Sequence, residues 1–178
     1  QPPCELWFVD PRTFGEVVVF DPNQLSEQMP ELIRLGVDPL VEEFTPEILH
    51  QRFAGKRGNL KGTLLNQSVI AGIGNIYADE IMHRAGLRWS RVPGRLSMPT
   101  IERLHRAIVQ ILGDAVASGG STLDDYQYVH VMGHGGSYQN EHRVYGRAGE
   151  MCLTCNKTRI SRTTVAGRTT CYCAVCQR

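Results

Sequence analysis

The stretch LKGTLLNQSVIAGIGNIYADE, residues 60–80, decides the fold of the central part of this chain. It predicts one helix over residues 60–70 and a second over residues 76–84. The two glycines within residues 71–74 disfavour a continuous helix, because glycine loses the most backbone entropy on ordering. Asn75 can then act as the N-cap of the second helix. The sequence therefore predicts two helices joined by a tight, glycine-rich turn.

Further helices are predicted on both sides of this turn. Thr45 and Pro46 are a typical N-cap and first residue of a helix that runs to about residue 53. A short helix is expected near residues 30–35. The longest helix is predicted over residues 98–117. Its apolar residues recur every three to four positions, as expected of a helix with one buried face: Ile101, Leu104, Ile108, Ile111 and Ala115.

The N-terminal residues 5–20, ELWFVDPRTFGEVVVF, predict two β-strands. Apolar residues alternate before a turn at Asp10 and Pro11, and a β-branched run follows at residues 17–20. We interpret residues 1–22 as the last strands of an N-terminal β-sandwich domain. The expected fold class is therefore mainly α with a small β part.

Two C-x-x-C pairs, separated by 17 residues, lie near the C-terminus. This spacing is typical of a zinc ribbon, in which four thiolates bind one ion. Since so short a tail cannot bury a core of its own, metal binding must supply its folding free energy. Redox pairs or buried free thiols are the alternatives, and no βαβ pattern supports the redox alternative. The expected ligands of one structural Zn²⁺ are Cys152, Cys155, Cys173 and Cys176.

Charge is unevenly distributed, although the net charge is only +1. Residues 1–50 hold two basic and ten acidic residues, whereas residues 143–178 hold seven basic residues and one acidic residue. This basic part suits a polyanion partner, with a solvated surface as an equal alternative. No apolar run approaches the roughly 18 residues of a membrane helix, so no membrane association is expected. Cys4 and Cys171, outside the two pairs, fit a reducing cytoplasm better than a secreted disulfide framework.

The glycine-rich turn before residue 76 is a candidate anion site. Glycines let the backbone approach a ligand closely, and the first N–H groups of the following helix have no partner within it. The helix dipole adds a positive field there, so a phosphate is the natural guest. Lys56 and Lys61 precede the turn and can reach the same side. The alternative is an ordinary turn whose glycines only permit close packing.

Three motifs stand in order along the chain. They are DPRTFG at residues 10–15, LKxxLLNQ with GxGNIYADE within residues 60–80, and VYGRxGxxC with RxTxxCxxCQ within residues 144–177. Together they resemble the bacterial formamidopyrimidine-DNA glycosylase family, which includes the endonuclease VIII enzymes. The resemblance covers nearly the whole chain and implies a helix–two-turn–helix DNA-binding domain followed by a zinc finger.

The resemblance also implies roles for individual residues. Asn75 would bind backbone phosphate beside the lesion. Arg12 would contact the base orphaned when the damaged nucleotide is flipped out, and Phe14 would wedge the stack. Arg168, at the tip of the zinc hairpin, would hold the flanking phosphates and act catalytically in δ-elimination. The complete set of expected DNA-binding residues is Arg12, Phe14, Lys56, Lys61, Asn75 and Arg168.

In that family the nucleophile is an N-terminal proline amine. It attacks the sugar C1′, and the resulting Schiff base allows β- and then δ-elimination. This chain begins Gln1-Pro2-Pro3 instead, and we expect the domain that holds the proline and its glutamate to be missing. The resemblance thus implies a parent DNA glycosylase and AP lyase that removes oxidised purines in base-excision repair. These residues alone are expected to bind damaged double-stranded DNA without excising a base.

The expected organisation has four segments, in a monomer of the bacterial cytoplasm associated with the nucleoid. They are the end of a β-domain at residues 1–22, a linker at 23–45, the DNA-binding domain at 46–142 with a lesion-recognition loop at about 118–142, and the zinc finger at 143–178.

Three other functions stay open at this point. An endonuclease VIII-type enzyme would remove oxidised pyrimidines, but the length and glycines of the loop over residues 118–142 favour purines. A non-catalytic module could bind RNA or the ribosome, although a plain binder needs no wedge such as Arg12 and Phe14. A zinc-ribbon adaptor between proteins is a third alternative, and the basic C-terminal part argues against it.

Overall fold

The computed structural model describes residues 7–10, 15–123 and 134–178. The chain divides into two compact units, residues 1–34 and residues 35–178. None of the described residues of the first unit is buried. In its described part, residues 7–10 and 15–34, the regular structure consists of three short helical segments: η1 (Pro22–Gln24), α1 (Leu25–Gln28) and α2 (Pro30–Ile33).

The two strands expected over residues 5–20 do not form in the part that the structure describes, residues 7–10 and 15–20. Trp7 is 79% exposed and Val19 is 96% exposed, so the apolar side chains there bury no common face. A two-stranded hairpin is marginal in water without a third strand or a helix to pack on. The β-propensity of these residues is therefore not realised in this unit.

Four helices form the body of the second unit. They are α3 (Pro46–Phe53), α4 (Leu60–Leu64), α5 (Asn75–Arg84) and α6 (Met98–Ala117). The predicted bounds of α3 and α6 are confirmed, and Thr45 caps α3 by accepting the N–H of Ile48. The apolar stripe of α6 is buried against α5 and α3. One hydrophobic core therefore joins the helices of this unit.

Helix α4 is shorter than the predicted helix over residues 60–70. The side-chain oxygen of Asn66 accepts the backbone N–H of Ser68, which turns the chain out of the helix. Ile70 then pairs with Val37 in an isolated parallel bridge. A partner 33 positions earlier in the chain thus competes with the local helix, and local periodicity cannot reveal it.

The C-terminus forms a two-stranded antiparallel hairpin of β1 (Ser161–Val165) and β2 (Arg168–Tyr172). Its turn residues, Ala166 and Gly167, have φ of 50° and 71°. Two left-handed residues in a row match the twist of the strands that they join. The prediction of a mainly helical chain that ends in a small β-hairpin is confirmed.

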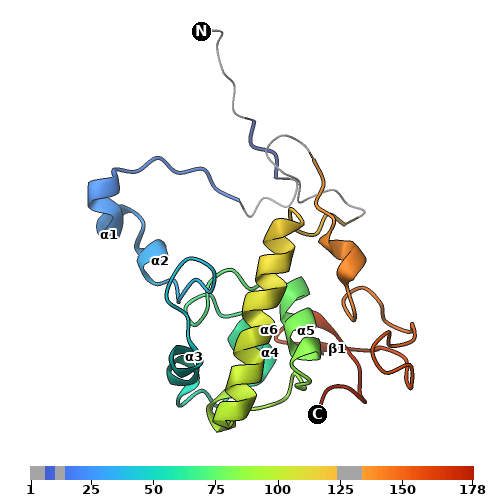
Figure 1. The fold of residues 1–178 in the computed structure, drawn as a ribbon. Helices are drawn as coiled ribbons and strands as arrows, with labels where there is room; N and C mark the ends of the chain where they lie inside the picture. The colour runs from blue at the N-terminus through green and yellow to red at the C-terminus, as the bar shows by residue number, and fades with distance from the viewer. Residues whose placement is uncertain (1–6, 11–14, 124–133) are drawn as a thin grey trace. The chain divides into compact units, whose positions relative to one another are not determined.

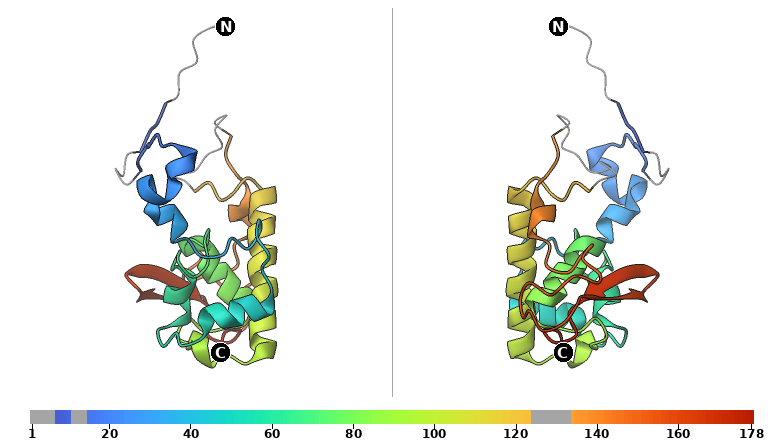
Figure 2. Two further views of the ribbon diagram at one scale, coloured as in Figure 1. Left: turned by 90° about the vertical axis from the view of Figure 1, so that its left-hand side faces the viewer. Right: turned by 90° about the vertical axis from the view of Figure 1, so that its right-hand side faces the viewer.

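In the second unit, α5 lies between α6 on one side and the hairpin on the other (Figures 1 and 2). Helix α5 contacts both of them directly. Among the described residues, no helix combines the length and the apolar character needed to cross a membrane. The arrangement makes α5 the element through which the helical body and the cysteine-rich hairpin meet.

Candidate metal centre and nucleic-acid interface

The four predicted ligands, Cys152, Cys155, Cys173 and Cys176, come together with all their sulfurs within 4.8 Å of one another. Cys152 Sγ lies 3.9 Å from Cys176 Sγ, and Cys155 Sγ lies 3.7 Å from Cys173 Sγ. Tetrahedral zinc with Zn–S bonds of about 2.3 Å requires S–S separations of about 3.8 Å. Both the donor set and its spacing therefore fit a four-coordinate metal ion.

Within this cluster, the pKa of the Cys152 thiol lies below its usual value. Burial raises its pKa, but hydrogen bonds from the backbone N–H of Cys155 and from the side chain of His83 help to lower the pKa to about 6. The nearest approach of His83 is 3.9 Å, from Nε2 to the Cys152 sulfur. Burial raises the pKa of the Cys173 and Cys176 thiols. A divalent cation would be needed to hold all four groups as thiolates at neutral pH.

Gln67 fixes the glycine-rich turn that precedes α5. Its Oε1 accepts the Gly72 N–H at 2.9 Å, and its Nε2 donates to the Ile73 carbonyl at 3.0 Å. Gly72 has φ of 85°, a conformation that favours glycine. The turn is therefore held in place before any ligand arrives. Gln67 belongs to the LKxxLLNQ motif, but the local sequence does not reveal that it holds this turn.

Asn75 is the first residue of α5, and Gly74 rather than Asn75 occupies the N-cap position. Asn75 already has helical geometry, so the prediction that it caps the helix is wrong. No side chain caps this end. The Asn75 Oδ1 is buried and has no hydrogen-bond partner among the described residues. An uncapped, positively polarised helix end of this kind suits an anionic ligand.

Arg168 begins β2, immediately after the hairpin turn, and its side chain is exposed. Within the described ranges it has no ion-pair partner. The adjoining turn packs near α4, because a Cβ placed on Gly62 would lie 3.7 Å from the Cβ of Ala166. The metal-binding hairpin thus presents an exposed cation next to the helical body.

Lys61 is predicted to contact a DNA phosphate, which requires an exposed side chain, but the structure buries this side chain. Its side chain is 0% exposed, and its Nζ lies 2.7 Å from Asp79 Oδ1. The same ammonium donates to the Thr169 carbonyl at 2.8 Å. Because the amine is buried and already bonded, Lys61 cannot reach a backbone phosphate in this conformation. Local sequence could not reveal this, since the partners lie in α5 and β2.

The other predicted contact residues are distributed more widely. Lys56 is exposed in the segment between α3 and α4. Its carbonyl accepts the Gly94 N–H at 3.2 Å, so its backbone is anchored to the segment before α6. Arg12 and Phe14 lie outside the described residues. Lys56 and Arg168 are therefore the exposed cations of the predicted set that the structure places.

The predicted lesion loop is described only at its two ends, residues 118–123 and 134–142. The ends lie against each other, because Ser137 donates its N–H to the Ser118 carbonyl at 2.9 Å and Tyr138 donates to the Gly120 carbonyl at 3.0 Å. His142 Nε2 also lies 3.1 Å from the side-chain hydroxyl of Ser121, in the first of these two ends. The base of the loop is thus closed by hydrogen bonds.

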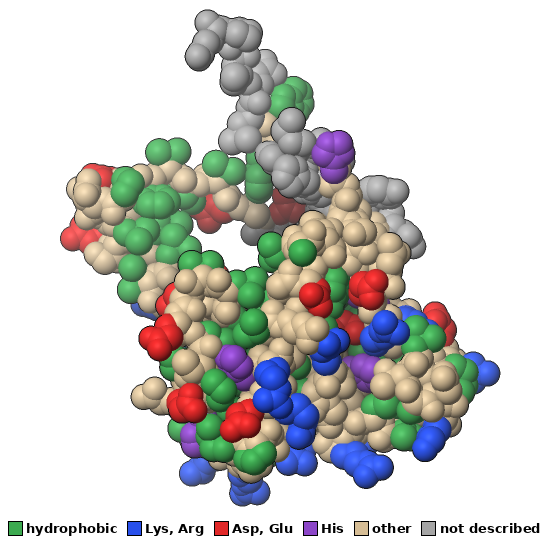
Figure 3. All heavy atoms as spheres, viewed as in Figure 1, with side chains coloured by type: hydrophobic (Ala, Val, Ile, Leu, Met, Phe, Trp, Pro, Cys, Tyr) green, Lys and Arg blue, Asp and Glu red, His purple; other side chains and the backbone are tan. Residues whose placement is uncertain are grey.

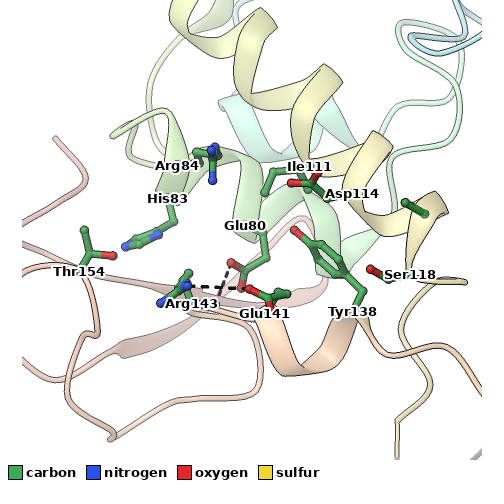
Figure 4. A pocket seen from close by; sticks show the side chains of 11 residues that line it. Glu80, His83, Arg84, Ile111, Asp114, Ser118, Tyr138, Glu141, Arg143 and Thr154 are labelled. Atoms are coloured by element: carbon green, nitrogen blue, oxygen red, sulfur yellow. Dashed lines mark hydrogen bonds and ion pairs between the residues drawn. The ribbon is translucent and has the colours of Figure 1, made fainter.

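Glu80 joins α5 to the start of the zinc-finger segment. Its buried carboxylate accepts three successive backbone N–H groups, from Arg143, Val144 and Tyr145, at 2.8–2.9 Å. The side chain borders a cavity of about 580 Å³ between α5, α6 and η3 (Tyr138–Glu141), shown in Figure 4. The local sequence does not reveal this role of Glu80, because the three N–H groups lie more than 60 residues further along the chain.

Figure 3 shows Lys and Arg side chains gathered over the helices and the zinc-finger segment of the second unit, with few acidic side chains between them on its lower part. Of the seven basic residues within 143–178, all except Arg147 are exposed. Such a surface attracts polyanions.

The second unit matches a known domain family. Residues 35–127 match the family described as the formamidopyrimidine-DNA glycosylase H2TH domain. A formamidopyrimidine-DNA glycosylase of Geobacillus kaustophilus is 43% identical over 98% of this chain and 62% of its own length. One from Desulfitobacterium hafniense is 41% identical over 97% of this chain and 62% of its own length. The chain spans about 62% of the length of these relatives.

Solved structures give the same similarity. The MutM (Fpg) protein of Thermus thermophilus aligns with a TM-score of 0.80 and 41% identity, over 85% of this chain and 57% of that one. The Lactococcus lactis Fpg in complex with DNA containing Fapy-dG aligns with a TM-score of 0.76 and 33% identity, over 88% of this chain and 56% of that one.

Proposed function

Because this chain belongs to the formamidopyrimidine-DNA glycosylase family, we propose that it is the DNA-binding portion of a bifunctional glycosylase and AP lyase for oxidised purines. The observation that supports this most is a pair of anion-binding features in the second unit: the uncapped α5 end at Asn75, and Arg168 on the hairpin beside α4. Helix end and guanidinium are both typical partners of backbone phosphate. The proposed partner is therefore damaged double-stranded DNA.

The four-cysteine cluster is proposed to hold one structural Zn²⁺. Sulfur donors at tetrahedral spacing and the small core around them support zinc over a harder ion. When bound, the ion supplies no reaction chemistry but stabilises the hairpin that presents Arg168. We also propose residues 46–142 as the DNA-binding domain, with a lesion loop at about 118–142, and residues 143–178 as the zinc finger.

The remaining roles are proposed from the resemblance of the sequence motifs to that family. Lys56 supports phosphate binding, Arg12 contacts the orphaned base, and Phe14 wedges the base stack. Arg168 takes part in δ-elimination by holding the phosphates beside the lesion. The protein is proposed to act as a monomer in the bacterial cytoplasm, at the nucleoid.

Arg168→Ala and Asn75→Ala should separate two kinds of phosphate contact. Both should weaken binding to lesion and undamaged duplexes alike. Only Arg168→Ala should also lower the slope of log K against log salt, by about 0.9, because it removes a cation that displaces counterions. Fluorescence anisotropy titrations over a range of salt concentrations measure both quantities.

Arg106→Ala is the matched control, since Arg106 is exposed and belongs to α6. Helix α6 lies on the other side of α5 from the hairpin (Figure 2). Arg106→Ala should change neither affinity nor slope by a comparable amount. If Asn75→Ala altered base preference at unchanged affinity, its phosphate role would be refuted.

A polypeptide limited to residues 1–178 should bind lesion DNA but release no oxidised guanine. The reaction needs an activated amine, and the exposed side chain of Lys56 is not in the desolvated pocket that activates a lysine as a nucleophile. The buried amine of Lys61 is held by Asp79. Borohydride trapping on DNA with oxidised guanine is the measurement. A covalent complex formed at a lysine of this polypeptide would contradict the prediction.

A further inference from the structure

A buried ion pair lies where three elements of the second unit meet. Lys61 Nζ, from α4, is 2.7 Å from Asp79 Oδ1, from α5, and both side chains are 0% exposed. Lys61 also donates to the Thr169 carbonyl at 2.8 Å, and Asp79 Oδ2 accepts the Cys171 N–H at 2.8 Å. Each charged group therefore has one bond to its partner and one to the backbone of β2.

These bonds connect the two proposed phosphate contacts. Asp79 lies four residues after Asn75 in α5, on the same face of the helix. Thr169 directly follows Arg168 in β2. The pair thus links α5, the helix that begins at Asn75, to the strand that begins with Arg168, through one buried and one partly buried hydrogen bond to that strand.

Hydrogen bonds between buried charged groups restrict geometry more strongly than apolar packing does. Apolar contacts would hold the hairpin against α4 and α5 but would tolerate small shifts of one against the other. A bonded charge pair accepts one geometry, because a displaced hairpin leaves a buried charge or N–H without its partner. The two bonds to β2 therefore fix its position along α5.

We propose that Lys61 and Asp79 are positioning residues, which fix Arg168 relative to Asn75 so that both reach the same DNA backbone. This inference rests on the proposed function, and it assigns Lys61 a role other than contact with phosphate. The zinc site orders the hairpin internally, and the ion pair orients the hairpin on the helical body.

A double-mutant cycle between Lys61→Met and Arg168→Ala tests the proposal in the full, zinc-loaded chain. A duplex with an abasic-site analogue serves as the probe. Lys61→Met alone should weaken binding about tenfold or more, and in the Arg168→Ala background it should weaken binding far less, because the group it positions is already gone. Additive losses would mean that Lys61 contacts DNA independently, and would overturn the proposal.

A second measurement needs no DNA. In Asp79→Leu, hydrogen exchange at the Cys171 amide should be about tenfold faster or more, while zinc content stays unchanged. Asp79→Asn keeps one side-chain oxygen as a hydrogen-bond acceptor, so it should accelerate hydrogen exchange at Cys171 by less. This variant provides the test if Asp79→Leu does not fold. Unchanged exchange in Asp79→Asn and in any folded Asp79→Leu would overturn the proposal.

Glu43→Gln is the matched control, since it removes an exposed carboxylate from the segment before α3, outside the proposed DNA-binding domain. It should leave exchange at Cys171 and DNA affinity unchanged. If the unsubstituted chain failed to bind DNA, the proposed function would fail, while the exchange measurements would still decide whether the pair orients the hairpin.

Discussion

Lys61→Met is expected to lower the free energy of unfolding by about 3–5 kcal/mol near neutral pH, because it leaves a buried carboxylate without its cation. The methionine side chain fills nearly the same volume, so lost packing is a small part of this loss. Asp79 then keeps the Cys171 N–H as the hydrogen-bond donor to its carboxylate. Urea denaturation with excess zinc measures the difference.

The pH dependence of this loss has a definite sign. Burial raises the pKa of Asp79 to about 6, against the lowering effects of the Cys171 N–H and of Lys61. A carboxyl with a raised pKa gives stability that is present below its unfolded pKa and lost as the pH rises through about 6. Without Lys61 the pKa of Asp79 rises further, so the variant protonates it more readily.

The deficit of Lys61→Met relative to the unsubstituted chain should therefore be largest at about pH 8 and should shrink toward about pH 6. Lys61→Met combined with Asp79→Leu should recover most of the loss at about pH 8, because buried pairs can be replaced by apolar residues at little cost. A deficit that is equal at both pH values, with no recovery in the double variant, would show that packing rather than charge causes the loss.

Helix α6 and the cysteine cluster are features that the sequence alone predicts correctly. The bounds of α6 could be predicted, because its apolar period, Pro99 in its first turn and Gly119 just after its end are local signals. The cysteine cluster could be predicted as well, because knuckle spacing is a property of the sequence. In both cases the physics that decides the structure acts within a few residues.

Long-range pairing explains what could not be predicted. Helix α4 ends early, and Ile70 instead pairs with Val37, far away in sequence. Lys61 resembles a surface lysine until Asp79 and the hairpin backbone are placed beside it. The three N–H donors to Glu80 likewise come from a distant segment, which the fold brings next to α5. These roles are created by the fold and leave no local pattern.

Cys173→Ser should release the metal ion and unfold the hairpin while the helices persist. Cys173 is 0% exposed, and its sulfur accepts the Cys176 N–H at 3.4 Å. The small core that Cys173 belongs to consists mostly of cysteines, whereas the helices have a separate core. Two strands alone are marginal, and structural zinc contributes on the order of 10 kcal/mol of folding free energy in comparable small sites.

We expect about one zinc per chain in the unsubstituted protein and almost none in Cys173→Ser. Exchange of the β1–β2 amides should become fast, helical circular dichroism should be largely retained, and affinity for lesion DNA should fall by about 100-fold or more as Arg168 loses its support. Cys171→Ser is the control, because Cys171 is buried outside the four-sulfur cluster and should leave zinc bound. Substitution of a true ligand removes one of the four donors of the zinc ion. If Cys171→Ser lost zinc and Cys173→Ser retained it, Cys171 rather than Cys173 would be the ligand.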